Sequence, residues 1–329
     1  MSALPREEWD RLREMRAGFL ESEGRAQPGA SADYFRTWRD VELYDATFAR
    51  RIEWKWVAAL REIALRTPTL RPSSVFDWAC GSGAATRALL TSPVGQNVRS
   101  VRLWDRSRRA MEYAREALLE VRPDLQVLLA PSGDPTGADL FLASHVLDEL
   151  DVDGEAALER ALRGASAAVV LESGTRASSR RLGALRARLL DLFTPIAPCT
   201  HAAGCGALAR PDDWCHFFAR PPAEVFRDAF WAEFGRELGV DLRSLAYSFV
   251  ALAKSPSAQP TGLHRILGRP RMLKGRALVD ACSASGVQTL SLLERLDRKL
   301  VKSLDEASNE PRLWRLEIDG ERIRSLTVH

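Results

Sequence analysis

The cysteines of this 329-residue chain are unevenly distributed. Cys199, Cys205 and Cys215 fall within one stretch that is rich in proline and glycine, and Cys282 follows later in the chain. Proline and glycine predict loops here rather than a helix or a strand. Four thiolates suit a tetrahedral zinc ion or an iron–sulfur cluster, because both prefer soft sulfur ligands. We therefore expect these four cysteines to share one metal centre.

Two alternatives to an all-cysteine centre remain open. His201 and His216 adjoin the cysteines, so a mixed Cys/His zinc site is one of them. Reduced structural thiols without a metal are the other. The spacing matches neither the paired CxxC knuckles of a zinc ribbon nor a ferredoxin run. The fifth cysteine, Cys80, belongs to a different motif and is not expected to bind the metal.

That second motif is typical of a nucleoside-binding turn. The apolar run 73–79 predicts a strand, and Gly81 and Gly83 follow it before a helical stretch. Glycines at such a turn let the backbone pass close to a ligand. Asp77 precedes the glycines, and Asp105 ends the next predicted strand, where a carboxylate accepts hydrogen bonds from ribose hydroxyls.

The elements that must position these residues follow from an alternation of strand-like and helical runs. The strand-like runs are 73–79, 98–105, 125–130, 138–146 and 167–173, with helical stretches at 84–91, 107–120 and 154–163. This alternation is typical of a parallel sheet with right-handed crossovers. We therefore predict an α/β fold with a Rossmann-like core.

Differences in composition divide the chain into four segments. We expect an N-terminal helical segment (1–70), the core (71–194), a Cys-rich metal-binding insertion with a late core strand (195–258) and a basic, β-rich C-terminal extension (259–329). The aromatic residues before the core recur at helical spacing and are interpreted as packing groups between helices. Asp319-Gly320 predicts a hairpin turn in the extension.

The charge and hydropathy of the chain limit the kinds of partner that we expect it to bind. The stretch 264–276 holds five Lys/Arg residues and no acid, so it either attracts phosphates or forms a solvated basic surface. The whole chain carries only +3, with 47 basic and 44 acidic residues. No apolar run is long enough to cross a bilayer, and the first residues lack the pattern of a signal or transit peptide. We expect a cytoplasmic protein with reduced thiols and no membrane contact.

The glycine turn resembles the first motif of class I S-adenosylmethionine (SAM) methyltransferases. The family pattern is apolar-Asp-apolar-Gly-x-Gly-x-Gly, and Ala79 stands here in place of the first glycine. The resemblance implies that the methionine part of SAM lies over Gly81 and Gly83, the ribose on Asp105 and the adenine near Asp134.

No catalytic base is assigned from the sequence. The run 138–146 is not followed by the Asn/Asp-Pro-Pro-aromatic sequence that holds an exocyclic base amine, nor by a Pro-Cys pair. His145, Asp148 and Glu149 follow this run at the mouth of the predicted site. They are candidates for positioning a substrate, and structural or helix-capping roles are equally open.

A more specific resemblance involves Trp214-Cys215-His216-Phe217. Together with Glu172-Ser173-Gly174-Thr175 and Tyr247-Ser248-Phe249, this block resembles the methyltransferase-like assembly factors of the mitochondrial small ribosomal subunit and their bacterial relatives, over roughly residues 40–290. The resemblance implies a 4Fe–4S cluster on Cys199, Cys205, Cys215 and Cys282. It also implies a role on small-subunit rRNA in ribosome assembly or translation.

Three hypotheses of function follow. Asp77, Gly81, Gly83 and Asp105 favour a SAM-dependent methyltransferase acting on small-subunit rRNA. Ala79 and the missing base-specific motif favour a non-catalytic rRNA-binding assembly factor with the same fold and an Fe–S cluster. A small-molecule methyltransferase with a structural zinc ion is the third.

Overall fold

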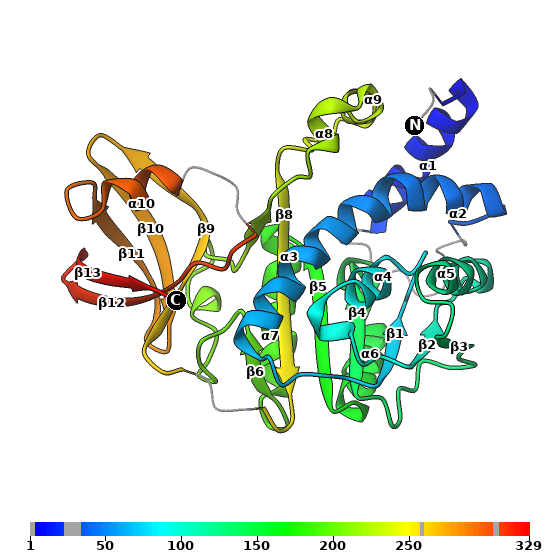
Figure 1. Ribbon diagram of the computed structural model, residues 1–329, viewed down its shortest axis with the longest axis horizontal. Coiled ribbons are helices and arrows are strands. Elements are labelled where there is room, and N and C mark those ends of the chain that lie inside the picture. The colour runs from blue at the N-terminus through cyan, green and yellow to red at the C-terminus, as the bar shows by residue number, and fades with distance from the viewer. Residues whose placement is uncertain (1–3, 23–33, 257–259, 305–308) are drawn as a thin grey trace.

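The computed structural model describes residues 4–22, 34–256, 260–304 and 309–329. Along the chain, N-terminal helices lead into an eight-stranded sheet with helices on both faces, and a five-stranded barrel closes the sequence (Figure 1). None of the helices in these residues combines the length and hydropathy that a membrane span requires.

The helices in the described residues are α1 (Arg6–Ser22), α2 (Trp38–Tyr44), α3 (Arg50–Arg66), α4 (Ala84–Leu90), α5 (Arg108–Val121), α6 (Val152–Gly164), α7 (Arg176–Leu189), α8 (Glu224–Arg227), α9 (Ala229–Leu238) and α10 (Arg298–Ser303). A π-helical turn, η1 (Asp45–Ala49), joins α2 to α3, and short 3-10 turns are η2 (Pro93–Gly95), η3 (Leu147–Glu149) and η4 (Gly206–Leu208). The strands are β1 (Ser74–Trp78), β2 (Ser100–Trp104), β3 (Gln126–Leu129), β4 (Leu140–Ser144), β5 (Ala167–Ser173), β6 (Thr194–Ala197), β7 (Phe217–Ala219), β8 (Leu245–Ala253), β9 (Leu263–Leu273), β10 (Arg276–Ser283), β11 (Gly286–Leu293), β12 (Leu313–Asp319) and β13 (Arg322–Val328).

The first sheet has the strand order β3-β2-β1-β4-β5-β8-β6, and β7 pairs with β8. Strands β1 to β5 are mutually parallel, whereas β8 runs antiparallel to β5, β6 and β7. The predicted Rossmann-like core is therefore confirmed. Strands β4 and β5 are almost continuously buried, which is the pattern of parallel strands covered on both faces.

Two layers of helices cover this sheet. On one face Trp56 of α3, Leu89 of α4 and Leu118 of α5 are fully buried in one apolar cluster with strand side chains. On the other face Leu162 of α6 and Leu185 of α7 pack in a second cluster. The apolar side of each helix thus faces the sheet, and the turns after β1, β2 and β4 lie together at the carboxyl ends of the strands.

The last strands close into a barrel in the order β10-β11-β13-β12-β9. Its interior is filled by apolar side chains that include Val279, Leu290, Trp314 and Ile323. Strand β9 occupies most of the basic stretch 264–276, for which the sequence predicts only a charged surface. Its buried Ile266 packs inside the barrel, while the glycine, the proline and the arginines of the stretch mask the strand pattern.

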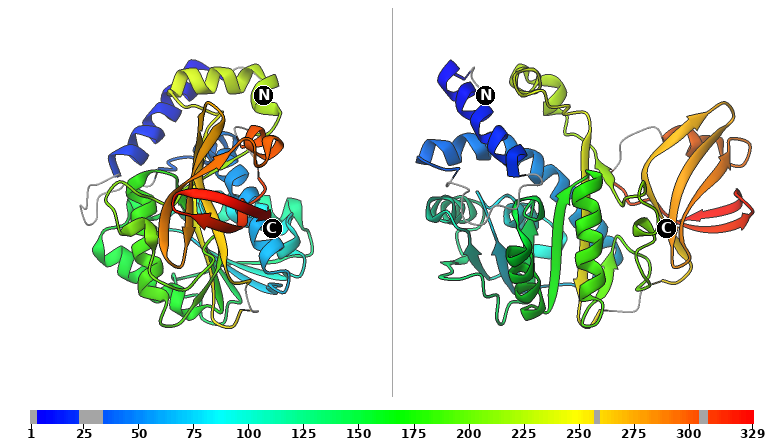
Figure 2. Two further views of the ribbon diagram at one scale, coloured as in Figure 1. Left: turned by 90° about the vertical axis from the view of Figure 1, so that its left-hand side faces the viewer. Right: turned by 180° about the vertical axis from the view of Figure 1, so that it is seen from behind.

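A buried ion pair joins the barrel to the core. The barrel lies beyond the β6 and β8 side of the sheet, and β3 forms the opposite edge (Figures 1 and 2). Arg265 of β9 donates to both carboxylate oxygens of Glu62 on α3, at 3.1 and 2.8 Å. The two side chains are only 7% and 2% exposed, and the Arg265 guanidinium lies 4.1 Å from the ring centroid of Phe217.

Candidate functional site

A cavity of about 320 Å³ opens at the carboxyl ends of the core strands. The strand order reverses between β1 and β4, and this is the place where α/β sheets bind ligands. Gly81 lines the cavity after β1, Asp105 after β2 and His145 after β4. Side chains from α1, η1 and α3 line it too, among them Phe19 and Phe48.

The turn after β1 is built for close backbone approach. Ala79, Gly81 and Gly83 all have left-handed backbones, with φ of 56°, 51° and 81°. A Cβ on Gly83 would lie 3.1 Å from the Cβ of Ala114 on α5, so glycine also permits close packing of α5 against this turn. The left-handed region disfavours a residue with a Cβ by about 1–2 kcal/mol, so Ala79 adopts a strained backbone where the methyltransferase pattern has glycine.

The two predicted aspartates have different contacts. Asp105 accepts a hydrogen bond from the Gly81 N–H at 2.9 Å and another from the Ser107 N–H at 2.8 Å, which fixes its carboxylate in the cavity wall. Asp77 is buried in β1, and Thr86 of α4 donates to one of its carboxylate oxygens at 2.6 Å. Burial raises the pKa of Asp77 to about 7.

Asp134 does not line this cavity. Its exposed carboxylate accepts hydrogen bonds from the backbone and hydroxyl of Thr136, at 2.9 and 2.6 Å. The neighbouring Gly133 packs against the indoles of Trp78 and Trp104, which occupy the cavity wall on this side. The structure thus keeps Gly81 and Asp105 together at the cavity but separates Asp134 from them.

The turn after β4 presents His145 to the cavity in a left-handed backbone, with φ of 54°. The Glu172 carboxylate of β5 anchors this turn by accepting from the N–H groups of Val146 and Leu147, at 3.0 and 3.1 Å. The Nε2 atom of His145 is buried without a hydrogen-bond partner among the described residues. Asp148 and Glu149 also line the cavity, as their position in the sequence predicts.

Two cations on α3 complete the cavity wall, and sequence reasoning missed both. Arg51 and Lys55 line the cavity and are one helical turn apart. The aromatic residues around them give this segment the pattern of a helix that packs against other helices. The one sign of a functional side chain in that pattern is a lysine, which lies between Trp54 and Trp56 and is buried.

The four clustered cysteines converge in space at the junction of core and barrel. Each thiol interacts electrostatically with the other three. Burial raises the pKa of Cys282 to about 12 and raises that of Cys215 well above its usual value, and the neighbouring thiols add to both shifts. Gly206, next to Cys205, approaches the β10–β11 turn so closely that a Cβ would lie 2.7 Å from the Cα of Gly286.

Buried arginines hold the loop that carries three of these cysteines. Arg186 of α7 donates to the backbone oxygens of His201 and Ala203, and Arg66 of α3 donates to that of Cys199 at 2.7 Å. The Nε2 atom of His201 lies 3.9 Å from the Cys282 sulfur. Across the described residues, however, no group of three or more His, Cys, Asp or Glu side chains is arranged to hold a metal ion. The predicted metal centre is therefore not confirmed.

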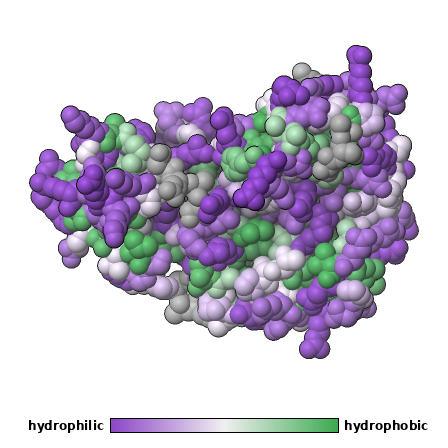
Figure 3. Space-filling model, turned by 45° about the horizontal axis from the view of Figure 1, so that its top comes forward, coloured by the Kyte–Doolittle hydropathy of each residue, from purple (hydrophilic) through white to green (hydrophobic). Residues whose placement is uncertain are grey.

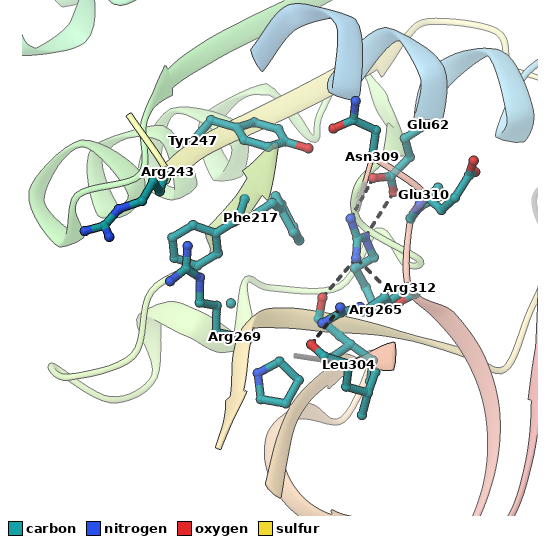
Figure 4. A pocket seen from close by; sticks show the side chains of 15 residues that line it. Glu62, Phe217, Arg243, Tyr247, Arg265, Arg269, Leu304, Asn309, Glu310 and Arg312 are labelled. Carbon is teal, nitrogen blue, oxygen red and sulfur yellow. Dashed lines mark hydrogen bonds and ion pairs between the residues drawn. The ribbon is translucent and has the colours of Figure 1, made fainter. Parts of the chain in front are cut away.

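A second cleft, of about 260 Å³, lies between the sheet edge and the barrel (Figure 4). Its arginines are Arg243, Arg265, Arg269 and Arg312. Arg265 is paired with Glu62. The exposed Arg269 stacks its guanidinium over Phe218, with its central carbon 4.2 Å from the ring centroid. The predicted basic stretch thus contributes one buried structural arginine and one exposed arginine to the same cleft.

A family model described as mitochondrial small ribosomal subunit Rsm22 matches residues 45–299. The match includes the whole cavity-bearing sheet and all four clustered cysteines. The chain belongs to the Rsm22 family.

Solved methyltransferase structures resemble this Rsm22-family chain at low identity. The O-methyltransferase of neocarzinostatin biosynthesis is 16% identical over 74% of this chain and 70% of its own, with a TM-score of 0.42. Magnesium protoporphyrin IX methyltransferase of Synechocystis is 12% identical over 75% and 100%, with a TM-score of 0.39. A Pyrococcus horikoshii protein provisionally named an RNA methyltransferase is 8% identical over 75% and 98%, also at 0.39. A comparison with curated proteins found no match.

Proposed function

We propose that this Rsm22-family chain binds SAM in the cavity and acts on small-subunit rRNA during ribosome assembly or translation. The observation that carries the proposal is the cavity at the place where the strand order reverses. There the left-handed glycine turn meets the carboxylate of Asp105. Its volume lies within the range of small-molecule sites, about 300–1,000 Å³.

The residues present fit SAM, which when bound supplies a methyl group on a positively charged sulfonium. Gly81 leaves room for the ligand to approach the backbone, and the buried Asp77 joins β1 to α4 through Thr86. Asp105 is placed to accept hydrogen bonds from the ribose hydroxyls. Aromatic side chains such as Phe19 and Trp104 line the cavity and restrict water.

Removal of the Asp105 carboxylate is expected to weaken the binding of S-adenosylhomocysteine (SAH), the demethylated form of SAM, by about 2–3 kcal/mol. The variant Asp105→Ala loses charge-assisted hydrogen bonds to the ribose. Isothermal titration calorimetry measures the effect, and Asp134→Ala is the matched control because that aspartate lies outside the cavity. If wild-type protein gives neither heat nor a thermal shift with excess SAH, the SAM proposal is wrong.

A non-catalytic rRNA-binding factor is the second candidate. The strained Ala79 and the absence of an assigned base in the turn after β4 favour it. Methyl transfer to small-subunit particles, measured with radiolabelled SAM, separates the two functions. A protein that binds SAH and rRNA but transfers no methyl group belongs to the second class.

The rRNA contact is proposed for the exposed basic residues at the β9–β10 hairpin. Arg269, Arg271, Lys274 and Arg276 are all exposed, and the barrel side of the molecule has a largely hydrophilic surface (Figure 3). Guanidinium groups near aromatic rings, as at Arg269 and Phe218, suit a strand of RNA with accessible phosphates and bases.

The double variant Arg269→Ala/Arg271→Ala is expected to lower affinity for RNA by a similar factor on different sequences. Each lost phosphate contact reduces the slope of log K against log salt by about 0.7–0.9, so the slope falls by up to about two. Filter binding across a salt series measures it. The control Arg115→Ala/Arg160→Ala removes the same charge from α5 and α6. An unchanged slope in the first double variant would place the RNA contact elsewhere.

We further propose that Cys199, Cys205, Cys215 and Cys282 hold a 4Fe–4S cluster, with a zinc ion as the alternative. The convergence of their thiols supports a shared centre. Such a group favours thiolate ligands and would tie the loop 199–215 to strand β10.

A further inference from the structure

The cavity carries two basic side chains that have no acidic partner at contact distance among the described residues. Arg51 and Lys55 both line it, and neither has a hydrogen-bond or ion-pair partner among the described residues. The buried Arg265, by contrast, is paired with Glu62. A buried cation without a partner is costly, so its retention indicates a ligand.

Lys55 is the more buried of the two. Its side chain belongs to the buried face of α3, at 7% exposure, between the apolar neighbours Trp54 and Trp56. Burial lowers its pKa to about 7, and the charge of Arg51 adds to that shift. An anion placed in the cavity would restore the charged form.

The acids that line the cavity have partners other than Arg51 and Lys55. Asp105 accepts from the Gly81 N–H at 2.9 Å, and Asp148 accepts from the Ser178 hydroxyl at 2.5 Å. Glu149 pairs with Arg106 at 3.4 Å.

The charged and titratable groups that act on the two cations are His145 after β4, Glu172 of β5 and Arg16 of α1. Glu172 raises the pKa of Lys55, but one of its oxygens accepts from two backbone N–H groups and burial raises its own pKa to about 8. The imidazole of His145 is held neutral by burial and by the two cations.

The position of the cations along the cavity identifies the ligand group. Asp105 lies after β2 and the glycine turn after β1. The groups that act on Lys55 are His145, after β4, and Glu172, near the carboxyl end of β5, so the three places follow the spatial order of the sheet. A SAM molecule whose ribose lies on Asp105 and which passes over Gly81 points its amino-acid part toward β4. We propose that Arg51 and Lys55 form an anion subsite that binds the carboxylate of this amino-acid part. The proposal rests on the proposed SAM site.

Binding of a carboxylate at this subsite is expected to be coupled to the uptake of a proton. The bound carboxylate raises the pKa of Lys55, so the amine that is mostly neutral above pH 7 in the free protein takes up a proton on binding. At pH 8 the uptake is expected to approach about one proton per SAH, and it should disappear below pH 6, where Lys55 is already charged. Calorimetry in buffers of different ionisation enthalpy measures this uptake.

The decisive comparison uses two ligands that differ only in the amino-acid part. SAH carries the carboxylate, whereas methylthioadenosine keeps the adenine, ribose and sulfur and lacks it. Lys55→Met preserves the apolar stem and removes the amine. It is expected to weaken SAH about 10- to 100-fold and to abolish the proton uptake, while methylthioadenosine binds within about twofold of wild type. Lys55→Arg should recover most of the SAH affinity without the proton uptake, because guanidinium stays charged.

Each of the other possible results would contradict a different part of the proposal. If wild-type protein binds neither nucleoside, the SAM site itself is wrong. If both nucleosides bind and Lys55→Met weakens them equally or not at all, the carboxylate subsite is wrong. If the variant leaves SAH unaffected but weakens a short single-stranded RNA, the subsite takes a phosphate instead. Retained methylthioadenosine binding shows that the cavity of the variant is folded.

Discussion

Serine in place of any one clustered cysteine is expected to release the bound metal and to lower the thermal stability of the protein. The four positions are Cys199, Cys205, Cys215 and Cys282. The loop 199–215 contains little regular structure beyond η4 and few large apolar side chains to order it. Closing it against β10 costs conformational entropy that a metal centre offsets, so each ligand is needed for both the metal and the loop.

Anaerobic purification followed by iron, sulfide and zinc analysis measures this result. Cys80→Ser is the matched control, because Cys80 is buried in the glycine turn and should leave the metal content per folded protein unchanged. Iron with sulfide and a brown colour lost in air supports the 4Fe–4S cluster, and stoichiometric zinc supports the alternative. Wild-type protein that contains neither metal would refute the centre and leave the cysteines as structural thiols.

Glu62→Ala is expected to lower the free energy of unfolding by about 3–5 kcal/mol. The substitution leaves the buried Arg265 without its carboxylate, and Arg66, whose guanidinium lies 3.4 Å from the same carboxylate, loses part of its compensation. Breaking one side of a buried pair is costly because the remaining charge stays out of water. Urea denaturation followed by circular dichroism measures the change.

An exposed pair on the same helix provides the comparison. Arg61 of α3 pairs with Glu310, and both side chains are more than half exposed, at 54% and 56%. Glu310→Ala should therefore change stability by less than about 1 kcal/mol. The double variant Glu62→Met/Arg265→Met should recover part of the loss, because Arg265 no longer leaves an unpaired buried charge, while Arg66 still lacks the Glu62 carboxylate. A Glu62→Ala effect no larger than that of Glu310→Ala would mean that the pair does not secure the barrel.

The core could be predicted from the sequence because its signals are local. A strand followed by closely spaced glycines, and a carboxylate at the end of the next strand, appear in the order that brings Gly81 and Asp105 together at one edge. The hairpin at Asp319-Gly320 is equally local: β12 and β13 pair directly across it. Each of these features depends on backbone conformation within a few residues.

The residues that were missed depend on contacts between distant segments. Lys55 has the sequence context of a packing helix, and only the placement of α3 over the turn after β4 brings it to the cavity. Strand β9 is hard to predict from the sequence because it contains a charged residue, Arg265, at a buried position. The partner that makes this burial possible, Glu62, is far away in the sequence. Asp134 has the expected position after β3, but the indoles of Trp78 and Trp104 separate it from the cavity.

Helix α3 connects regions that are otherwise far apart in the molecule. Lys55 faces the cavity, Glu62 holds the barrel and Arg66 binds the backbone of Cys199. At 1.5 Å per residue the first and last of these lie only about 16 Å apart along one helix axis. The contacts of α3 with the cavity, with the barrel and with the loop 199–215 are thus all made by one continuous helix. A displacement of this helix as one body would therefore act on all three regions together.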